Sequence, residues 1–153
     1  MKVKDIMKRD VASLKPEDNA LEALNLLFKR QISGLPVIDA SGRLLGMFTE
    51  KSVLSHVLPS YIEQVGTFIY EDDPKSTKKK FTELNTLKVG KLMKKEVLTT
   101  TEDTALSEVA RLMLTEKARR LPVIDKTGRV VGIVARCDIL MALAKEAELP
   151  IKN

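Results

Sequence analysis

Hydrophobic and polar positions run through the same series of periods twice along the chain. Each series opens with a short extended piece, followed by an acidic segment typical of a helix start and by apolar residues at helical spacing. Two short apolar runs come next, joined by an Asp-x-x-Gly segment that predicts a tight turn, and a second helix closes the series. Each series therefore predicts the order β-α-β-β-α. In the first series the predicted elements are an extended piece at 10–14, a helix after the cap 17–19, strands at 35–38 and 44–48 and a helix from Ser52. In the second series they are an extended piece at 96–100, a helix after the cap 102–104, strands at 121–124 and 130–134 and a helix from Asp138. The apolar residues of the first helix are Leu21, Leu24, Leu27 and Phe28 in the first series and Leu106, Val109, Leu112 and Met113 in the second.

The two series are copies of each other. The stretch LPVIDASGRLLG at 35–46 returns 86 residues later as LPVIDKTGRVVG at 121–132, with eight of the twelve positions identical. The match extends upstream, where VKDIM at 3–7 corresponds to VGKLM at 89–93, and downstream into the final helix. Chance similarity does not hold its register over about 50 residues. The chain is therefore a tandem duplication with an insert between the copies.

The duplication predicts the fold class. The second apolar run of each copy is almost wholly apolar, which predicts a strand buried on both faces. A unit of about 60 residues is marginally stable alone, so we expect the copies to pack together. The predicted fold is α/β (α+β), with two β-α-β-β-α repeats packed with pseudo-two-fold symmetry, sheets facing inward and two equivalent clefts between them. The predicted divisions are a first repeat at 1–57, a helical and loop insert at 58–87, a second repeat at 88–147 and a tail at 148–153.

The insert is rich in aromatic residues, which is unusual for a solvated linker. One interpretation continues the last helix of the first repeat to about Ile69 and returns through a loop at 71–80. The other places the aromatics over a subunit interface or a ligand cleft. The four aromatic residues are Tyr61, Phe68, Tyr70 and Phe81.

Composition narrows the class of protein. The 153 residues are 44% apolar and 31% charged, as in soluble globular proteins. No apolar run approaches the roughly 20 residues of a membrane span, and the charged N-terminus lacks the core of a signal peptide, so we expect a cytoplasmic protein without membrane contact. A single cysteine, Cys137, excludes an internal disulfide, and a single histidine, His56, excludes a His-rich metal site. No catalytic or phosphate-loop motif is present, so neither an enzyme nor a cofactor is expected.

The charge of the chain favours anionic partners without identifying one. The formal net charge is +5 and the sequence pI about 9.3. The basic residues are spread out, apart from the run 78–80, which we interpret as a solvated loop. No aromatic stacking platform interleaves with arginine, so nucleic acid is an unlikely partner.

The duplicated pattern LPVIDxxGRxxG, followed by apolar residues and Asp or Ser before the last helix, resembles the cystathionine β-synthase (CBS) domain. The leading Val-x-x-hydrophobic-Met signal at 3–7 and 89–93 is also similar to that family. The resemblance covers the chain except the insert and the last residues. It implies a non-catalytic sensor of adenosine-containing ligands, such as AMP, ADP, ATP, S-adenosylmethionine or a dinucleotide, bound in the cleft between the repeats.

The resemblance assigns the ligand's ribose to Asp138, whose carboxylate can accept two charge-assisted hydrogen bonds. The alternative is that Asp138 only caps the last helix. The family has Thr or Ser at the position of Ala135, whose lost contact costs about 0.5–1.5 kcal/mol. The first repeat keeps Thr49 but has Ser52 in place of the aspartate and Glu50 nearby. The resemblance therefore implies two unequal clefts, of which that of the first repeat is weak, empty or adapted to another ligand.

The same resemblance places basic and apolar residues around the ligand. Arginine suits phosphate because its donors form a planar fork; the alternative for Arg119 and Arg120 is ordinary surface arginines at a helix end. Cys137, beside Asp138, is interpreted as a packing residue rather than a redox switch, and His56 receives no role. The complete predicted ligand-binding set is Asp138, Arg119, Arg120, Ala135, Arg136, Pro122 and Thr99, with Thr49, Ser33, Gly34, Pro36 and Lys51 in the first repeat.

These expectations define a stand-alone regulatory module that binds an adenosyl ligand and acts by conformational or oligomeric change. A homodimer and a protein partner in trans are expected with it. Two alternatives stay open: a structural or adaptor dimer that has lost ligand binding, and a basic nucleic-acid-binding protein that uses the run 78–80.

Overall fold

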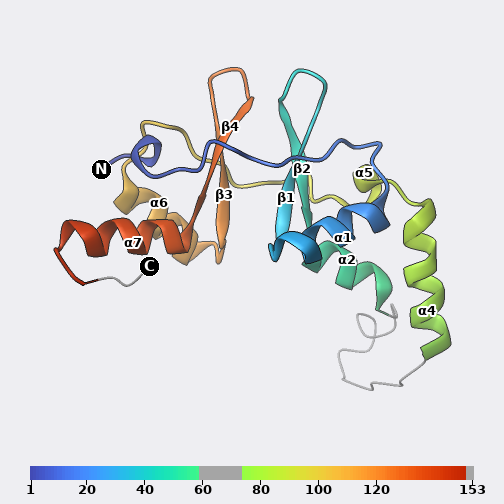
Figure 1. The fold of residues 1–153 in the computed structure, drawn as a ribbon. Coiled ribbons are helices and arrows are strands. Elements are labelled where there is room, and N and C mark those ends of the chain that lie inside the picture. Colours follow the sequence, from blue (N-terminus) through green and yellow to red (C-terminus); the bar gives the residue numbers. More distant parts are fainter. Residues whose placement is uncertain (59–73, 151–153) are drawn as a thin grey trace. The chain divides into compact units, whose positions relative to one another are not determined.

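The helices and the two later strands of each predicted repeat are present (Figure 1). The opening extended pieces at 10–14 and 96–100 are not strands: each forms a single parallel bridge, Leu14 to Val37 and Thr100 to Val123. The structure, a computed structural model, describes residues 1–58 and 74–150. Within these residues no helix combines the length and apolar character of a bilayer span. The elements are η1 (Val3–Asp5), α1 (Ala20–Arg30), β1 (Gly34–Ile38), β2 (Leu44–Thr49), α2 (Glu50–Val57), α4 (Pro74–Glu83), η2 (Leu84–Thr86), α5 (Val89–Leu92), α6 (Leu106–Thr115), β3 (Arg120–Ile124), β4 (Val130–Ala135) and α7 (Arg136–Glu146).

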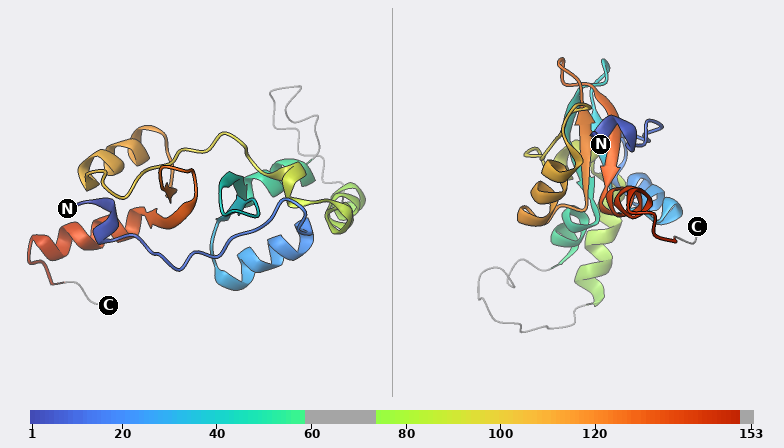
Figure 2. Two further views of the ribbon diagram at one scale, coloured as in Figure 1. Left: turned by 90° about the horizontal axis from the view of Figure 1, so that it is seen from above. Right: turned by 90° about the vertical axis from the view of Figure 1, so that its left-hand side faces the viewer.

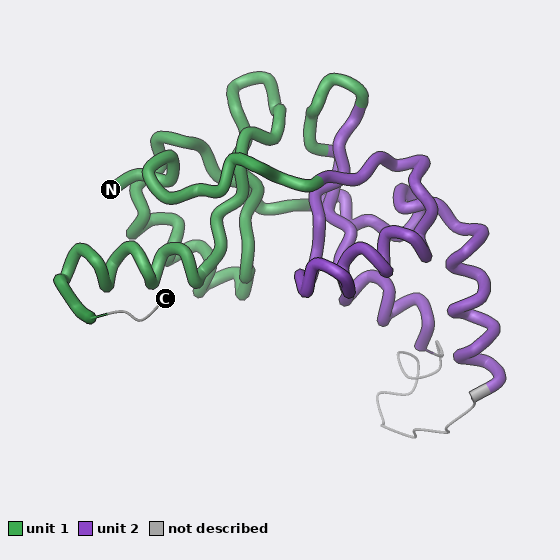
Figure 3. The backbone as a smooth tube through the Cα atoms, in the orientation of Figure 1, with its two compact units in different colours: residues 1–12, 40–44, 97–153 green, residues 13–39, 45–96 purple. Residues whose placement is uncertain are grey.

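The chain forms two compact units, neither of which is continuous in sequence (Figure 3). Unit 1 consists of residues 1–12, 40–44 and 97–153, and unit 2 of residues 13–39 and 45–96. The segment that leads the first repeat is therefore folded with the strands and helices of the second, and the segment that leads the second repeat is folded with those of the first.

The leading segment of unit 1 is held by a third strand pairing. Val3 is fully buried and Met7 nearly so, both within the core of this unit. Lys8 and Ile133 exchange two backbone hydrogen bonds of 2.9 Å, which adds the segment to the edge of β4. Gly132 permits this approach, because a Cβ there would lie 2.8 Å from Met7 Sδ. The apolar-x-x-x-Met signal is thus a packing signal.

Unit 2 has the same arrangement, formed by the residues that correspond to those of unit 1 in the other repeat, 86 positions away in the sequence. Val89 is fully buried, and Lys94 and Met47 exchange backbone hydrogen bonds of 2.8 and 2.9 Å beside β2. A Cβ on Gly46 would lie 2.6 Å from the Lys94 carbonyl oxygen. A glycine in the second strand of each repeat is therefore required by the close approach of the leading segment.

The sheet of unit 1 has a fixed register. β3 pairs antiparallel with β4, with Leu121 opposite Val134, and Thr100 forms a parallel bridge to Val123. The hairpin turn is of the predicted kind, since Gly128 has a φ of +85° and its N–H donates to the Asp125 carbonyl oxygen at 3.1 Å. Figure 2 shows α6 and α7 beside this hairpin. The core of the unit gathers Val3, Met7, Leu106, Val109, Met113, Leu121, Val123, Val134 and Ile139.

Two predictions about burial are wrong. The second strand of the first repeat is not buried on both faces: Gly46 and Phe48 are buried, but Leu45 is 37% exposed, whereas β4 has no exposed residue. Only alternate residues face the core of a small two-stranded sheet. Phe28 is 61% exposed rather than part of the apolar face of α1, since it lies in the last turn of that helix.

The insert also differs from its predicted course. α2 ends at Val57, because Leu58 has extended backbone angles, so the helix does not continue as predicted. The segment predicted as a loop at 71–80 forms most of α4, which starts at Pro74, a residue that suits the first helical position. Phe81 is 40% exposed on α4. The remaining part of the predicted helix, with Tyr61, Phe68 and Tyr70, lies outside the described residues.

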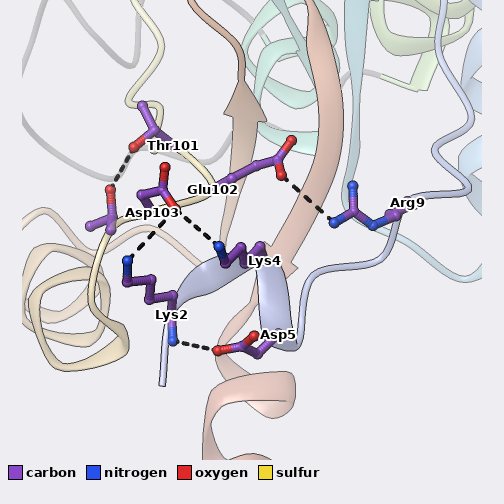
Figure 4. Close-up of polar contacts among 8 residues, drawn as sticks. Lys2, Lys4, Asp5, Arg9, Thr101, Glu102 and Asp103 are labelled. Carbon is purple, nitrogen blue, oxygen red and sulfur yellow. Dashed lines mark hydrogen bonds and ion pairs between the residues drawn. The ribbon is translucent and has the colours of Figure 1, made fainter.

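The acidic segment before α6 fastens the N-terminus instead of capping the helix (Figure 4). The N-cap residue of α6 is Ala105, without a side-chain bond, so the predicted cap is wrong there. Asp103 instead lies 3.3 Å from the Lys4 ammonium and 3.7 Å from that of Lys2, and Glu102 pairs with Arg9 at 3.7 Å. In α1 the prediction is confirmed, because Asn19 Oδ1 accepts the Glu22 N–H at 3.0 Å.

We expect the Lys4→Gln substitution to raise the pKa of Asp103 toward its ordinary value. The hydrogen bond and the charge of Lys4, and then the charge of Lys2, hold this pKa below 3.8. Because the folded pKa is depressed, the contribution of the pair is complete above pH 3.8 and is lost as the pH falls through the folded pKa. An NMR titration of the Asp103 carboxyl measures it, with Lys145→Gln as the control. An unchanged midpoint in Lys4→Gln would contradict the pairing.

Candidate functional site

The twelve residues predicted to bind a ligand fall into two groups, one at the start of α7 and one at the start of α2. The structure brings the members of each group onto the same unit. The α7 site consists of Thr99, Arg119, Arg120, Pro122, Ala135, Arg136 and Asp138 in unit 1. The α2 site consists of Ser33, Gly34, Pro36, Thr49 and Lys51 in unit 2.

Strand register assembles the α7 site. β3 begins where β4 ends, so Arg120 lies opposite Ala135. The Arg136 N–H, at the start of α7, donates to the Arg119 carbonyl oxygen at 3.1 Å. Pro122 is buried, and its carbonyl oxygen accepts the Thr100 N–H at 3.0 Å, next to half-buried Thr99. The end of the sheet where β3 begins and β4 ends thus brings together residues from both strands, the start of α7 and the segment before Thr100.

Asp138 caps α7 and keeps capacity for a further partner. Its Oδ2 accepts the Ala135 N–H at 3.2 Å, as the capping interpretation predicts. Its Oδ1 lies 3.9 Å from the Lys8 ammonium, and the side chain is 15% exposed. A carboxylate accepts about four hydrogen bonds, so the cap leaves most of its acceptor positions unused. The capping and ligand-binding interpretations are therefore compatible.

Lys8 is a neighbour of Asp138 that sequence reasoning missed. It lies on the leading segment of the first repeat, whereas Asp138 lies on the last helix of the second. The backbone pairing of Lys8 with Ile133 brings the two together. No sequence signal could have found this contact, because it depends on which repeat the leading segment packs against. The Lys8 side chain is 71% exposed, so it is a solvent-accessible cation at the margin of the site.

Three arginines, Arg119, Arg120 and Arg136, have their backbones at the same end of the unit 1 sheet. α6 ends at Thr115, so Arg119 and Arg120 stand beyond its last turn, and Arg120 is already in β3. The interpretation of these two as cations at a helix end is therefore wrong. Arg136 Nε donates to the Ala118 carbonyl oxygen at 2.9 Å, which leaves its terminal nitrogens as donors. This end of the sheet combines these arginines with a single capped carboxylate.

The residue pair Arg120–Ala135 in the second repeat takes the place of Gly34 and Thr49 in the first. In unit 2 the equivalent residues are Gly34 and Thr49, and a Cβ on Gly34 would lie 3.0 Å from Thr49 Cγ2. A side chain at one of these positions therefore crowds a branched side chain at the other. Ala135 leaves room for Arg120, so the lost hydroxyl accompanies a gained guanidinium.

The α2 site is closed by its own hydrogen bonds. Thr49 Oγ1 accepts the Ser52 N–H at 3.1 Å and lies 3.0 Å from Ser52 Oγ. The Glu50 N–H donates to the Ser33 carbonyl oxygen at 2.9 Å, while Lys51 is exposed and Pro36 buried. The first turns of the two helices thus differ in chemistry: a hydroxyl pair caps α2, and a carboxylate caps α7.

Two further polar residues, Cys137 and His56, differ in how exposed they are. Cys137 is exposed, with Sγ 4.0 Å from Asp138 Oδ1, so its interpretation as a packing residue is wrong. The Nε2 atom of His56, a residue of α2, is buried and has no hydrogen-bond partner among the residues that the structure describes. Among residues 1–58 and 74–150, no three His, Cys, Asp or Glu side chains gather as a metal site would require.

Comparison with known proteins identifies close relatives of both repeats. The sequence model of the CBS domain matches residues 3–59 and 89–145. Protein MJ1426 of Methanocaldococcus jannaschii is 33% identical over 94% of this chain and 91% of its own length. The chloroplastic CBS domain-containing protein CBSX2 of Arabidopsis thaliana is 34% identical over 88% of this chain, which spans only 59% of CBSX2.

Solved structures of CBS-pair proteins are also similar to this chain. The crystal structure of CBSX2 in complex with AMP has a TM-score of 0.74 at 29% identity, and covers 95% of this chain and 98% of that one. The CBS domain pair of protein MJ0100, in complex with 5′-methylthioadenosine and S-adenosyl-L-methionine, has a TM-score of 0.68 at 25% identity, with 95% and 98% covered.

Proposed function

The chain belongs to the CBS domain family as a tandem pair, and from that premise we propose that it is a non-catalytic regulatory module that binds an adenosine-containing ligand at the α7 site. The complexes of CBSX2 with AMP and of MJ0100 with two adenosyl compounds support this ligand class. The observation that carries the proposal is Asp138, which is fixed by its cap bond and has acceptor positions to spare.

The chemistry of the α7 site suits the two polar parts of a nucleotide. The Asp138 carboxylate offers charge-assisted acceptors to the neighbouring hydroxyls of a ribose. Arg119, Arg120 and Arg136 offer planar donors to a phosphate. Lys8 leaves Asp138 when ribose hydroxyls take its place, and its ammonium is then available to the phosphate. Phosphorylated ligands such as AMP are therefore favoured over uncharged adenosine.

The proposed signal passes through a homodimer or to a protein partner in trans. α7 carries Asp138 in its first turn and exposes large apolar side chains further along, at Leu140, Met141 and Leu143. Exposed apolar surface of this kind is typical of contact surfaces. Ligand binding at the first turn of the same helix can shift the assembly only by its differential affinity for the two states.

We expect one adenosyl ligand to raise the melting temperature of the protein. A thermal-shift screen with AMP, ADP, ATP, S-adenosylmethionine, 5′-methylthioadenosine and NAD tests this, with guanosine monophosphate as the control. A ligand at about 100 times its Kd stabilises by about 2.7 kcal/mol, which is a rise of at least a few degrees. If no ligand raises the melting temperature and the protein is an intact dimer, the adaptor alternative replaces the proposal.

A further inference from the structure

The lysines of the insert lie on a helix and not in the predicted loop, so their side chains point in defined directions. In a loop such a run is solvated and undirected, but α4 carries Lys75, Lys78 and Lys79 within 74–83. Together with Thr82 and Thr86 these residues line one open depression, which also includes Glu83. We call the side chains of Lys75, Lys78, Lys79, Thr82 and Thr86 the lysine face. Its members are spaced three and four residues apart, so they share one side of the helix.

The lysines of the lysine face form no ion pair with the other residues that the structure describes. None of the ion pairs recorded among residues 1–58 and 74–150 involves Lys75, Lys78 or Lys79, whereas Lys80 pairs with Glu83 at 3.7 Å. That pair also compensates the one carboxylate in the depression. Residues 74–96 hold eight lysines and two glutamates, a formal charge of +6 against +5 for the whole chain. The positive charge of the protein is thus concentrated on this part of unit 2.

The lysine face lies outside both segments that match the CBS domain, which end at residue 59 and resume at residue 89. The family fold therefore does not account for it. The α7 site belongs to unit 1 and the lysine face to unit 2.

We propose that the lysine face binds the phosphate backbone of a nucleic acid, without sequence preference. Contacts to that backbone come from lysine ammonium groups, among other donors, and the depression holds three of them. The Thr82 and Thr86 hydroxyls donate to the Lys78 and Glu83 carbonyl oxygens at 2.9 and 2.8 Å, so the lysines supply the donors of this surface. The part of the face that lies on α4, from Lys75 to Thr82, is about 10 Å long at a rise of about 1.5 Å per residue. That length spans about three phosphates of one strand, since they follow at about 3.4 Å in the duplex.

Other partners of opposite charge fit this surface less well. Protein interfaces are depleted in lysine and are built around aromatic and arginine anchors, and the lysine face contains neither. Helices that lie on anionic membranes bury a broad apolar face, but the only large exposed apolar side chain recorded on the described part of α4 is Phe81. A surface whose only charged donors are lysines suits a polyanion that is bound through its phosphates.

The test is the salt dependence of binding to a fluorescent 20-base-pair duplex DNA, measured by anisotropy from about 50 to 200 mM KCl. Each phosphate contact contributes about 0.9 to the slope of log K against log salt. Replacing Lys75, Lys78 and Lys79 by Gln should therefore reduce the slope by about 2.7. Glutamine keeps the helix propensity of lysine, and circular dichroism verifies that the variant is folded.

A matched control separates the lysine face from net charge. Lys117→Gln, Lys126→Gln and Lys145→Gln remove three exposed lysines from unit 1 and should leave most of the slope in place. Asp138→Ala should not alter the slope, which separates this proposal from that for the α7 site. Equal losses in both triple variants, no binding at 50 mM salt, or binding only to vesicles of anionic phospholipid would each overturn the proposal.

Discussion

Replacing Asp138 by alanine weakens the binding of the adenosyl ligand about 10- to 100-fold, which is the largest effect we expect on function. Each hydrogen bond to a charged group contributes about 1.5–3 kcal/mol, and about 1.4 kcal/mol corresponds to a tenfold change in Kd. Isothermal titration calorimetry with the ligand found in the screen measures the loss. Asp138 is suited to this role because its Oδ2 is held by the Ala135 N–H and its position is fixed before the ligand arrives.

Two further variants separate the ligand contact from the helix cap. Alanine also removes the cap bond to Ala135, which costs stability of about 0.5–2 kcal/mol. Asp138→Asn keeps an acceptor for that N–H but loses the negative charge, so it should retain stability and still bind weakly. Ser52→Ala changes the equivalent position of the α2 site and should alter this Kd less than threefold. Equal losses from Asp138→Ala and Ser52→Ala would mean that the ligand is not at the α7 site.

Replacing Met7 by alanine is expected to have the largest effect on stability, and the effect should fall on unit 1. Met7 is nearly buried in the core of that unit and packs against Gly132. Removing a buried methionine side chain costs about 2–5 kcal/mol. Chemical denaturation measures the total, and hydrogen–deuterium exchange localises it. We expect faster exchange in β3, β4 and α7.

The equivalent substitution 86 residues later provides the control. Met93 packs against Gly46 in unit 2 and is only half-buried, so Met93→Ala should cost less and should accelerate exchange in β1 and β2. The two variants therefore separate the compact units from the sequence repeats. If Met7→Ala accelerated exchange in α1 and β1 instead, the leading segments would belong to their own repeats and the division into units would be wrong.

Local chemistry made the elements predictable. The turn at 125–128 needs a residue with positive φ at its end, and glycine is the residue that adopts it without cost. Asn19 caps α1 through its side chain, as its place before a helical period indicates. Prediction failed at Phe28 and in the insert, because periodicity does not show where an apolar face ends. It also placed the lysines 78–80 in a loop, although Pro74 favours a helix start.

The site was predictable only as two lists of residues. The resemblance to the CBS domain indicated Asp138, Arg120 and Ala135 by their places in its motif. Their relation was not indicated, since the exchange of Gly34 and Thr49 for Arg120 and Ala135 becomes intelligible only when the strand register places them opposite each other. Lys8 was missed because its contact with Asp138 spans 130 residues of sequence.

The sequence by itself determined that the protein is a duplicated β-α-β-β-α unit, which turns and helix starts it uses, and which family it resembles. These features depend on interactions within a few residues or on a register that recurs after 86 residues. Only the tertiary structure decided which repeat each leading segment joins. Both segments carry the same Val-x-x-hydrophobic-Met signal, and both second strands offer a glycine to receive it. Two equivalent local signals cannot specify their pairing, so long-range packing makes the choice and brings Lys8 to Asp138.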